Sequence, residues 1–109
     1  MDTVMQALSG VMSLVGKEGD DPYTMAFPVA DVAAGYAALA GIGAALYDRT
    51  KTGCGRWVDI SLLDVTVTLQ AYIGQSYLVT GKLPKKIGNS HPTNVPVGAF
   101  KCKDGEYVQ

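Results

Sequence analysis

A run of 16 residues without a charge, from Val32 to Tyr47, is the feature that most restricts how this chain can fold. The run is rich in Ala and Gly, and its larger side chains recur at helical spacing. A helix with so many small residues packs closely against other protein, and 16 residues fall short of the roughly 20 that a bilayer requires. We therefore expect a closely packed helix over 31–47 and no membrane insertion.

Periodic apolar residues predict two further helices. One covers 2–15, where Asp2 is placed to cap the start and Gly16 to end it. The other covers 62–79, with Gly81 as its C-cap.

Extended structure is predicted in two places. Apolar and polar side chains alternate within residues 56–61, and β-branched residues are among the apolar ones, which favours a strand. The chain after residue 95 resembles a hairpin whose turn lies at 103–105. The fold class is therefore α/β, mostly helical, with a strand and the start of a β-hairpin.

Composition agrees with one folded domain, since 48% of the 109 residues are hydrophobic and 17% are charged. The net charge of −1 argues against a nucleic-acid-binding protein. Cys54 and Cys102 lie far apart with no other ligand at metal spacing, so we expect no metal site and a reducing, cytoplasmic location. The N-terminus lacks a basic segment, and no signal peptide is expected.

Asp31 is the first candidate for chemistry. It follows the apolar segment 27–30 and opens the longest apolar helix. One interpretation is an N-cap whose carboxylate accepts backbone N–H groups. The other is a nucleophile, partly buried at the mouth of an apolar cleft and kept ionised by the helix N-terminus. The two interpretations are compatible.

The loop 88–94 holds the only histidine, His91. On spacing alone, a loop residue bonded to nearby backbone is the simpler interpretation. Asp59 is expected to face solvent or pair with a base, and Asp64 to lie in a first helical turn. Both are interpreted as structural.

Four blocks of residues, in order along nearly the whole chain, resemble the class III CoA-transferases. That family includes formyl-CoA transferase, carnitine CoA-transferase and alpha-methylacyl-CoA racemase. The blocks are Asp2-Thr-Val-Met-Gln-Ala-Leu-Ser-Gly10, Phe27-Pro-Val-Ala-Asp31 with Gly35, the segment from Arg49 to Asp64, and Gly88-Asn-Ser-His-Pro92.

The resemblance implies that the chain is an internal piece, or a truncated product, of a protein about four times longer. Residues 1–86 would belong to the large, Rossmann-like domain. Residues 87–109 would form a loop and the start of the linker to the small domain. Members of the family form interlocked homodimers, so the resemblance also implies a second copy as partner. The isolated piece is expected to be inactive.

The family's catalytic aspartate falls on Asp31, which the resemblance makes the nucleophile. It would carry the acyl group as a mixed anhydride and then CoA as an aspartyl thioester. Acyl-CoA and a carboxylic acid are substrates, and no permanently bound cofactor is implied. The family's loop over this aspartate corresponds to the segment with Gly88, Asn89 and His91, whose donors would steady an oxyanion.

Three alternatives stay open. Racemases of the family carry a histidine where this chain has Met1, and Gln6 also resembles the transferase branch, so a transferase is favoured over a racemase. The chain is alternatively a non-catalytic assembly module. A third interpretation makes 32–47 a membrane anchor.

Overall fold

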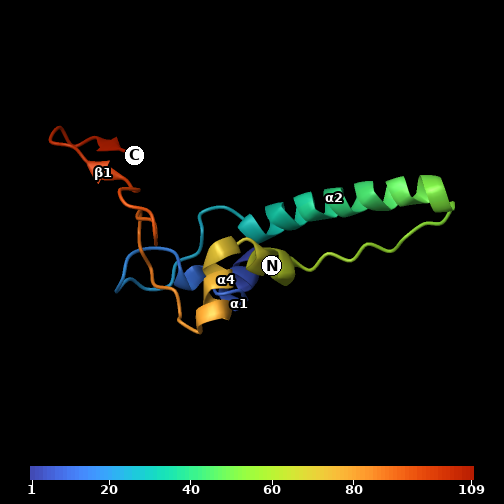
Figure 1. Cartoon of the computed structure of the whole chain (residues 1–109), viewed down its shortest axis with the longest axis horizontal. Helices are drawn as coiled ribbons and strands as arrows, with labels where there is room; N and C mark the ends of the chain where they lie inside the picture. Colours follow the sequence, from blue (N-terminus) through green and yellow to red (C-terminus); the bar gives the residue numbers. More distant parts are fainter.

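One long helix organises the molecule. In the computed structural model, which describes residues 1–109, helix α2 covers Val29–Thr52 and projects away from the other helices as a rod (Figure 1). It starts two residues earlier than the sequence predicts and ends five residues later. Gly53 closes it with a φ of 71°, a left-handed conformation that suits glycine.

The first part of α2 packs against two short helices, α1 (Asp2–Leu8) and α3 (Leu62–Thr68). Ala30 and Ala34 lie one turn apart on α2 and are buried. Their small side chains allow the other helices to approach closely. Gln6 of α1 and Thr66 of α3 are fully buried at the same place, so the centre of this packing is partly polar.

The predicted helix over 2–15 is interrupted. Helix α1 ends at Leu8, and a 3₁₀ turn, η1, covers Val11–Ser13. Gly10 between them has a φ of 85°, which lies outside the helical region and breaks the pattern. The apolar periodicity is the same on both sides of the break, and it therefore predicted one helix.

The predicted helix over 62–79 is also divided in two. Helix α4 covers Ala71–Thr80 and is separated from α3 by a turn in which Ala71 has a φ of 46°. Positive φ is uncommon for alanine, and no residue type there indicates a break. The predicted C-cap Gly81 is confirmed, with a φ of 68°.

The predicted strand over 56–61 is wrong, because the segment is extended but pairs with no other strand. It runs back along α2 instead (Figure 1). Val58 and Ile60 are half-buried and Asp59 is exposed, so the alternation was correct. It arises from packing on one side against a helix rather than from a sheet.

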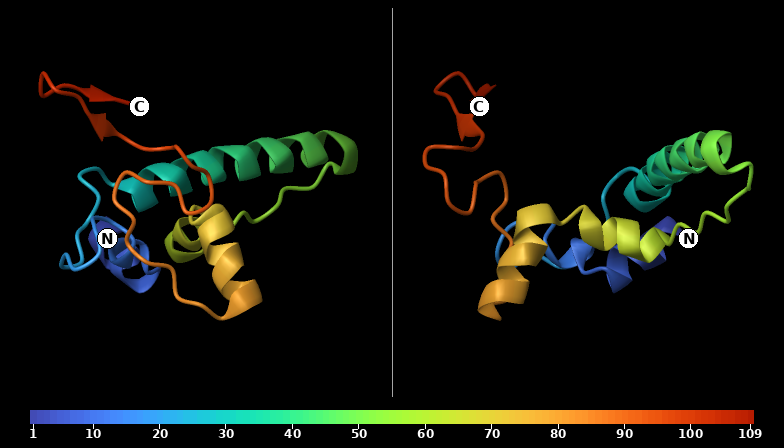
Figure 2. Two further views of the ribbon diagram at one scale, coloured as in Figure 1. Left: turned by 60° about the vertical axis from the view of Figure 1, so that its left-hand side comes forward. Right: turned by 45° about the vertical axis from the view of Figure 1, so that its right-hand side comes forward.

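A hairpin at the end of the chain is confirmed. Strands β1 (Phe100–Lys101) and β2 (Tyr107–Val108) pair antiparallel, with Phe100 opposite Val108. The turn between them contains Gly105, whose φ is 92°. The hairpin lies on the far side of the molecule from the free end of α2 (Figures 1 and 2). The hairpin and the helices together agree with the expected fragment of an α/β domain.

Much of the apolar surface of the chain is uncovered. The radius of gyration is 18.4 Å, whereas a compact chain of this length has about 13 Å. The accessible surface is 8318 Å², against about 5,800 Å² for a compact protein of this mass. On α2, Tyr36 and Leu39 are each about 70% exposed. The molecule therefore presents apolar faces that a compact domain would bury.

Helix α2 is also long and apolar enough to cross a membrane by length and composition, with a mean hydropathy of 1.6 over its best window. The core helix of a soluble protein passes the same test. The expectation of no membrane insertion stays a prediction.

Candidate active site

Asp31 lies in the first turn of α2, as the third residue of the helix. It is not the N-cap, because the helix already begins at Val29 and the cap position is Pro28. Its side chain is exposed rather than partly buried, and no hydrogen bond or ion pair engages the carboxylate. The Asp31 carboxylate therefore lies without a hydrogen-bond or ion-pair partner at the positive end of a helix.

Asp2 caps this helix from another part of the chain. Its Oδ1 accepts hydrogen bonds from the backbone N–H groups of Ala30 at 2.7 Å and Asp31 at 3.3 Å. Asp2 makes no capping bond in its own helix, α1, so the predicted local cap is wrong. The separation of 28 residues between Asp2 and Ala30 gives no local signal for this contact.

Gln6 holds Asp2 in place from the next turn of α1. Its Nε2 donates to Asp2 Oδ2 at 2.5 Å, and its Oε1 accepts from the N–H of Met25 at 2.7 Å. Both ends of a fully buried amide are thereby satisfied. Sequence reasoning used Gln6 only to separate two branches of a family and missed this role.

His91 is a loop residue bonded to nearby backbone, as its simpler interpretation predicted. Its Nδ1 accepts from the N–H groups of Thr93 at 3.2 Å and Asn94 at 3.0 Å. The ring also stacks on Tyr72 of α4, with centroids 5.7 Å apart.

The rest of this loop is fastened through its backbone. Gly88, with a φ of 59°, donates its N–H to the carbonyl of Gly16 at 2.9 Å. The carbonyl oxygen of Asn89 lies against Gly98, where an added β-carbon would stand only 2.8 Å from it. No hydrogen bond or ion pair joins Gly88, Asn89 or His91 to Asp31, so within this chain the two candidate parts are not brought together.

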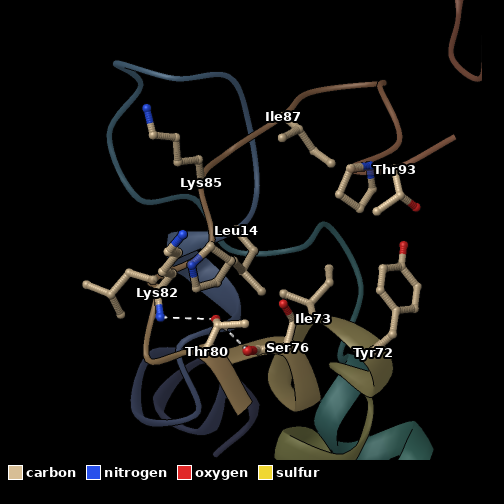
Figure 3. Close-up of a pocket in the computed structure, with 12 residues that line it drawn as sticks. Leu14, Tyr72, Ile73, Ser76, Thr80, Lys82, Lys85, Ile87 and Thr93 are labelled. Carbon is tan, nitrogen blue, oxygen red and sulfur yellow. Dashed lines mark hydrogen bonds between the residues drawn. The ribbon is translucent and has the colours of Figure 1, made fainter. Parts of the chain in front are cut away.

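Two pockets adjoin beside α4, because Leu14, Tyr72 and Ile73 line both. The first, of about 340 Å³, lies between α4 and the segment 82–93. Figure 3 shows Lys82 and Lys85 at its edge, with the N–H of Lys82 bonded to Thr80 Oγ1 at 3.2 Å. The second, of about 460 Å³, is almost wholly apolar and includes Val29 at the start of α2. Asp31 lines neither pocket.

An exposed ion pair lies next to the first pocket. Lys85 Nζ is 2.8 Å from Glu18 Oε1. The hydrogen bond and charge of Lys85 lower the pKa of the Glu18 carboxyl, and the same contact raises the pKa of Lys85. The pair connects the turn after η1 to the segment before Gly88, next to the backbone bridge between Lys17 and Ile87.

Comparisons with known proteins agree on one group. Human succinyl-CoA:glutarate CoA-transferase is 38% identical over 98% of this chain. Acetyl-CoA:oxalate CoA-transferase of Acetobacter aceti is 34% identical over 98% of the chain, and human alpha-methylacyl-CoA racemase is 41% identical over 94%.

A solved structure is also similar. The crystal structure of a CAIB/BAIF family protein from Brucella suis superimposes with a TM-score of 0.86 at 33% identity. The match covers 97% of this chain but only 28% of the Brucella suis chain. The chain likewise spans about a quarter of the length of the curated relatives named above.

The family model described as CoA-transferase family III matches residues 1–109, which is the whole chain. The fold neighbour and the relatives point the same way. The expected resemblance is confirmed: this chain belongs to CoA-transferase family III.

Proposed function

We propose that these residues carry the nucleophile of a CoA-transferase of the relatives' length, and that Asp31 is that nucleophile. The single observation that supports this is the free carboxylate of Asp31 at the start of α2, with the backbone N–H groups of the helix satisfied by Asp2 instead. A carboxylate without a partner is available to attack a thioester.

The proposed chemistry conserves the activation of the acyl group. A carboxylate oxygen of Asp31 attacks the acyl-CoA carbonyl, the C–S bond breaks, and a mixed anhydride and CoA thiolate form. The thiolate attacks the aspartyl carbonyl, which releases the donor acid and gives an aspartyl-CoA thioester. The acceptor carboxylate then repeats these two steps in reverse, and Asp31 is regenerated. No step uses water, so the active site must exclude it.

The loop with Gly88, Asn89 and His91 is proposed to cover this site in the complete protein and to place donors near the oxyanion. In this chain the loop is anchored at Gly16 and at Tyr72, which leaves it in a defined shape. Closure over Asp31 then depends on residues outside the chain or on a second copy. A division at residue 87, with a linker to a small domain beyond it, is proposed as well.

An interlocked homodimer is proposed as the assembly. The exposed apolar side chains of α2, among them Tyr36, Leu39 and Leu46, support burial against protein. A cytoplasmic protein with no membrane or nucleic-acid partner is proposed with it. Fractionation of cells that produce the protein tests the location: recovery with the membranes after a high-salt wash would favour the alternative in which α2 is an anchor.

The function is tested with the protein of the relatives' length that contains these residues, called the full-length enzyme below. Transfer of CoA from succinyl-CoA or acetyl-CoA to a panel of carboxylic acids, including glutarate and oxalate, is the expected activity. The 109-residue chain alone is expected to show none. If the full-length enzyme transfers CoA to no acid in a broad panel, a non-catalytic assembly module is the better interpretation.

A racemase is the second candidate, because the human racemase is 41% identical to the chain. The two reactions differ in the bond that is broken. A racemase exchanges the α-hydrogen of a 2-methylacyl-CoA with D₂O, whereas a transferase leaves it in place. Exchange of the α-hydrogen without CoA transfer would overturn the proposal that the protein is a transferase.

A further inference from the structure

The start of α2 is built so that Asp31 has no role in capping its own helix. Four N–H groups at a helix start lack intrahelical partners. In α2 one of the four positions is the N-cap Pro28, which has no N–H, and Val29 donates to the carbonyl of Phe27 at 2.8 Å. Asp2 Oδ1 takes the two that remain, those of Ala30 and Asp31.

Pro28 removes the other donor that Asp31 would reach. An acidic side chain at the third helical position commonly turns back to accept the N–H of the N-cap residue. Here the N-cap is proline, which has no N–H. The carboxylate of Asp31 therefore finds no free backbone donor at its own helix end.

The Asp2–Gln6 pair maintains this arrangement. Gln6 is fully buried and is bonded on both sides, to Asp2 Oδ2 at 2.5 Å and to the Met25 N–H at 2.7 Å. The Met25 N–H can only donate and the Asp2 carboxylate can only accept, so the orientation of Gln6 is fixed with its Oε1 toward Met25 and its Nε2 toward Asp2. Asp2 is thus held with Oδ1 toward α2.

We propose that Asp2, held by Gln6, is a positioning residue that keeps the Asp31 carboxylate free for the acyl group. This inference rests on the proposed function, and it assigns Asp2 no contact with substrate. When Asp2 is removed, the N–H groups of Ala30 and Asp31 lose their acceptor. The Asp31 carboxylate, in the same first turn of α2, can then turn back to them, and its attack on the thioester slows.

The test measures the rate at which acyl-CoA labels Asp31 in the full-length enzyme, with KM for acyl-CoA measured alongside. Asp2→Ala is expected to slow labelling about tenfold or more, while KM changes by less than about threefold. A purely structural role would lower the amount of active enzyme without slowing labelling of the folded fraction. Asp59→Asn is the matched control, an exposed carboxylate outside this network, and labelling is expected to stay at the wild-type rate.

A reciprocal pair of substitutions keeps the proposal testable if Asp2→Ala does not fold. Asp2→Asn places two amide donors against each other, and Gln6→Glu places two carboxylates against each other. The double variant Asp2→Asn/Gln6→Glu restores one donor and one acceptor, and leaves an oxygen toward Ala30 and another toward Met25. Labelling is expected to fall about tenfold in each single variant and to return to within about threefold of wild type in the double variant.

The outcomes separate this inference from the proposed function. Label at a residue other than Asp31 in the wild type would overturn the function. Label at Asp31 in the wild type, with equal rates in the single variants or with no recovery in the double variant, would leave the function standing and overturn the role of Asp2.

Discussion

Gly41 on α2 and Val58 of the extended segment lie so close that a β-carbon added at position 41 would stand 2.8 Å from Val58 Cγ1. The same atom would lie 3.7 Å from Ile60 Cδ1. Glycine at this position lets residues 56–61 lie directly on the helix. The contact explains why an alternating segment without a strand partner is nevertheless held in an extended conformation.

The first prediction tests this contact with two glycines on the same helix. Gly41→Ala is expected to displace the extended segment, because Val58 is stiff at χ1 and must move. Gly43→Ala meets nothing within 4 Å and should raise helix stability by up to about 1 kcal/mol. The NMR signals of the Val58 and Ile60 methyl groups in the 109-residue chain check both variants, and they should shift in Gly41→Ala but not in Gly43→Ala. Equal signals in the two variants would contradict the packing.

The second prediction concerns the loop around His91. His91→Phe removes the acceptor for the Thr93 and Asn94 N–H groups, whereas His91→Asn keeps a side-chain oxygen near them. We expect the Asn94 amide to exchange faster in the Phe variant by a factor that corresponds to about 1 kcal/mol, and to change little in the Asn variant. If the Phe variant protects Asn94 as well as the wild type does, stacking on Tyr72 holds the loop instead.

The third prediction concerns pH and the Glu18–Lys85 pair. The pKa of Glu18 is lowered from 4.5, so its stabilising effect is complete above that value and is lost as the pH falls through the lowered pKa. The pKa of Lys85 is raised from 10.5, so its effect is complete below that value and is lost as the pH rises through the raised pKa. The pair is therefore fully formed between about pH 4.5 and 10.5.

The NMR titration of the Glu18 side chain measures this directly. Its midpoint should lie below 4.5 in the wild type and return toward 4.5 in Lys85→Met. Because both groups are fully exposed, added salt should shift the wild-type midpoint in the same direction. A midpoint that is the same in the wild type and in Lys85→Met would show that the pair does not form in solution.

Local pattern predicted the helices and the hairpin but not what joins them. The apolar period located α2 and the turn residues located the hairpin, since both signals lie within a few residues. The sequence did not predict the break between α3 and α4 at Ala71, because alanine is not a helix-breaking residue. The sequence did not predict that Asp2 caps Ala30 either, because the two residues are 28 positions apart.

The candidate site was predicted unevenly for the same reason. The position of Asp31 at the helix start is correct to within two residues, but its assignment as N-cap is wrong. A clue lay in Pro28, which favours the first positions of a helix and so places Asp31 beyond the cap. The importance of Gln6 had no sequence signal, since a polar residue in an amphipathic helix is expected to be exposed.

The most direct test of the account is the location of the covalent intermediate in the full-length enzyme. The enzyme is incubated with acyl-CoA, the intermediate is trapped with hydroxylamine or borohydride, and the modified residue is located by mass spectrometry. Asp31→Asn serves as the control, since it preserves shape and should change stability by less than about 1 kcal/mol. We expect modification at Asp31 in the wild type, and neither modification nor acyl transfer in the variant, because an amide cannot form the anhydride. Modification at another residue, or more than about a tenth of wild-type activity in Asp31→Asn, would contradict the account.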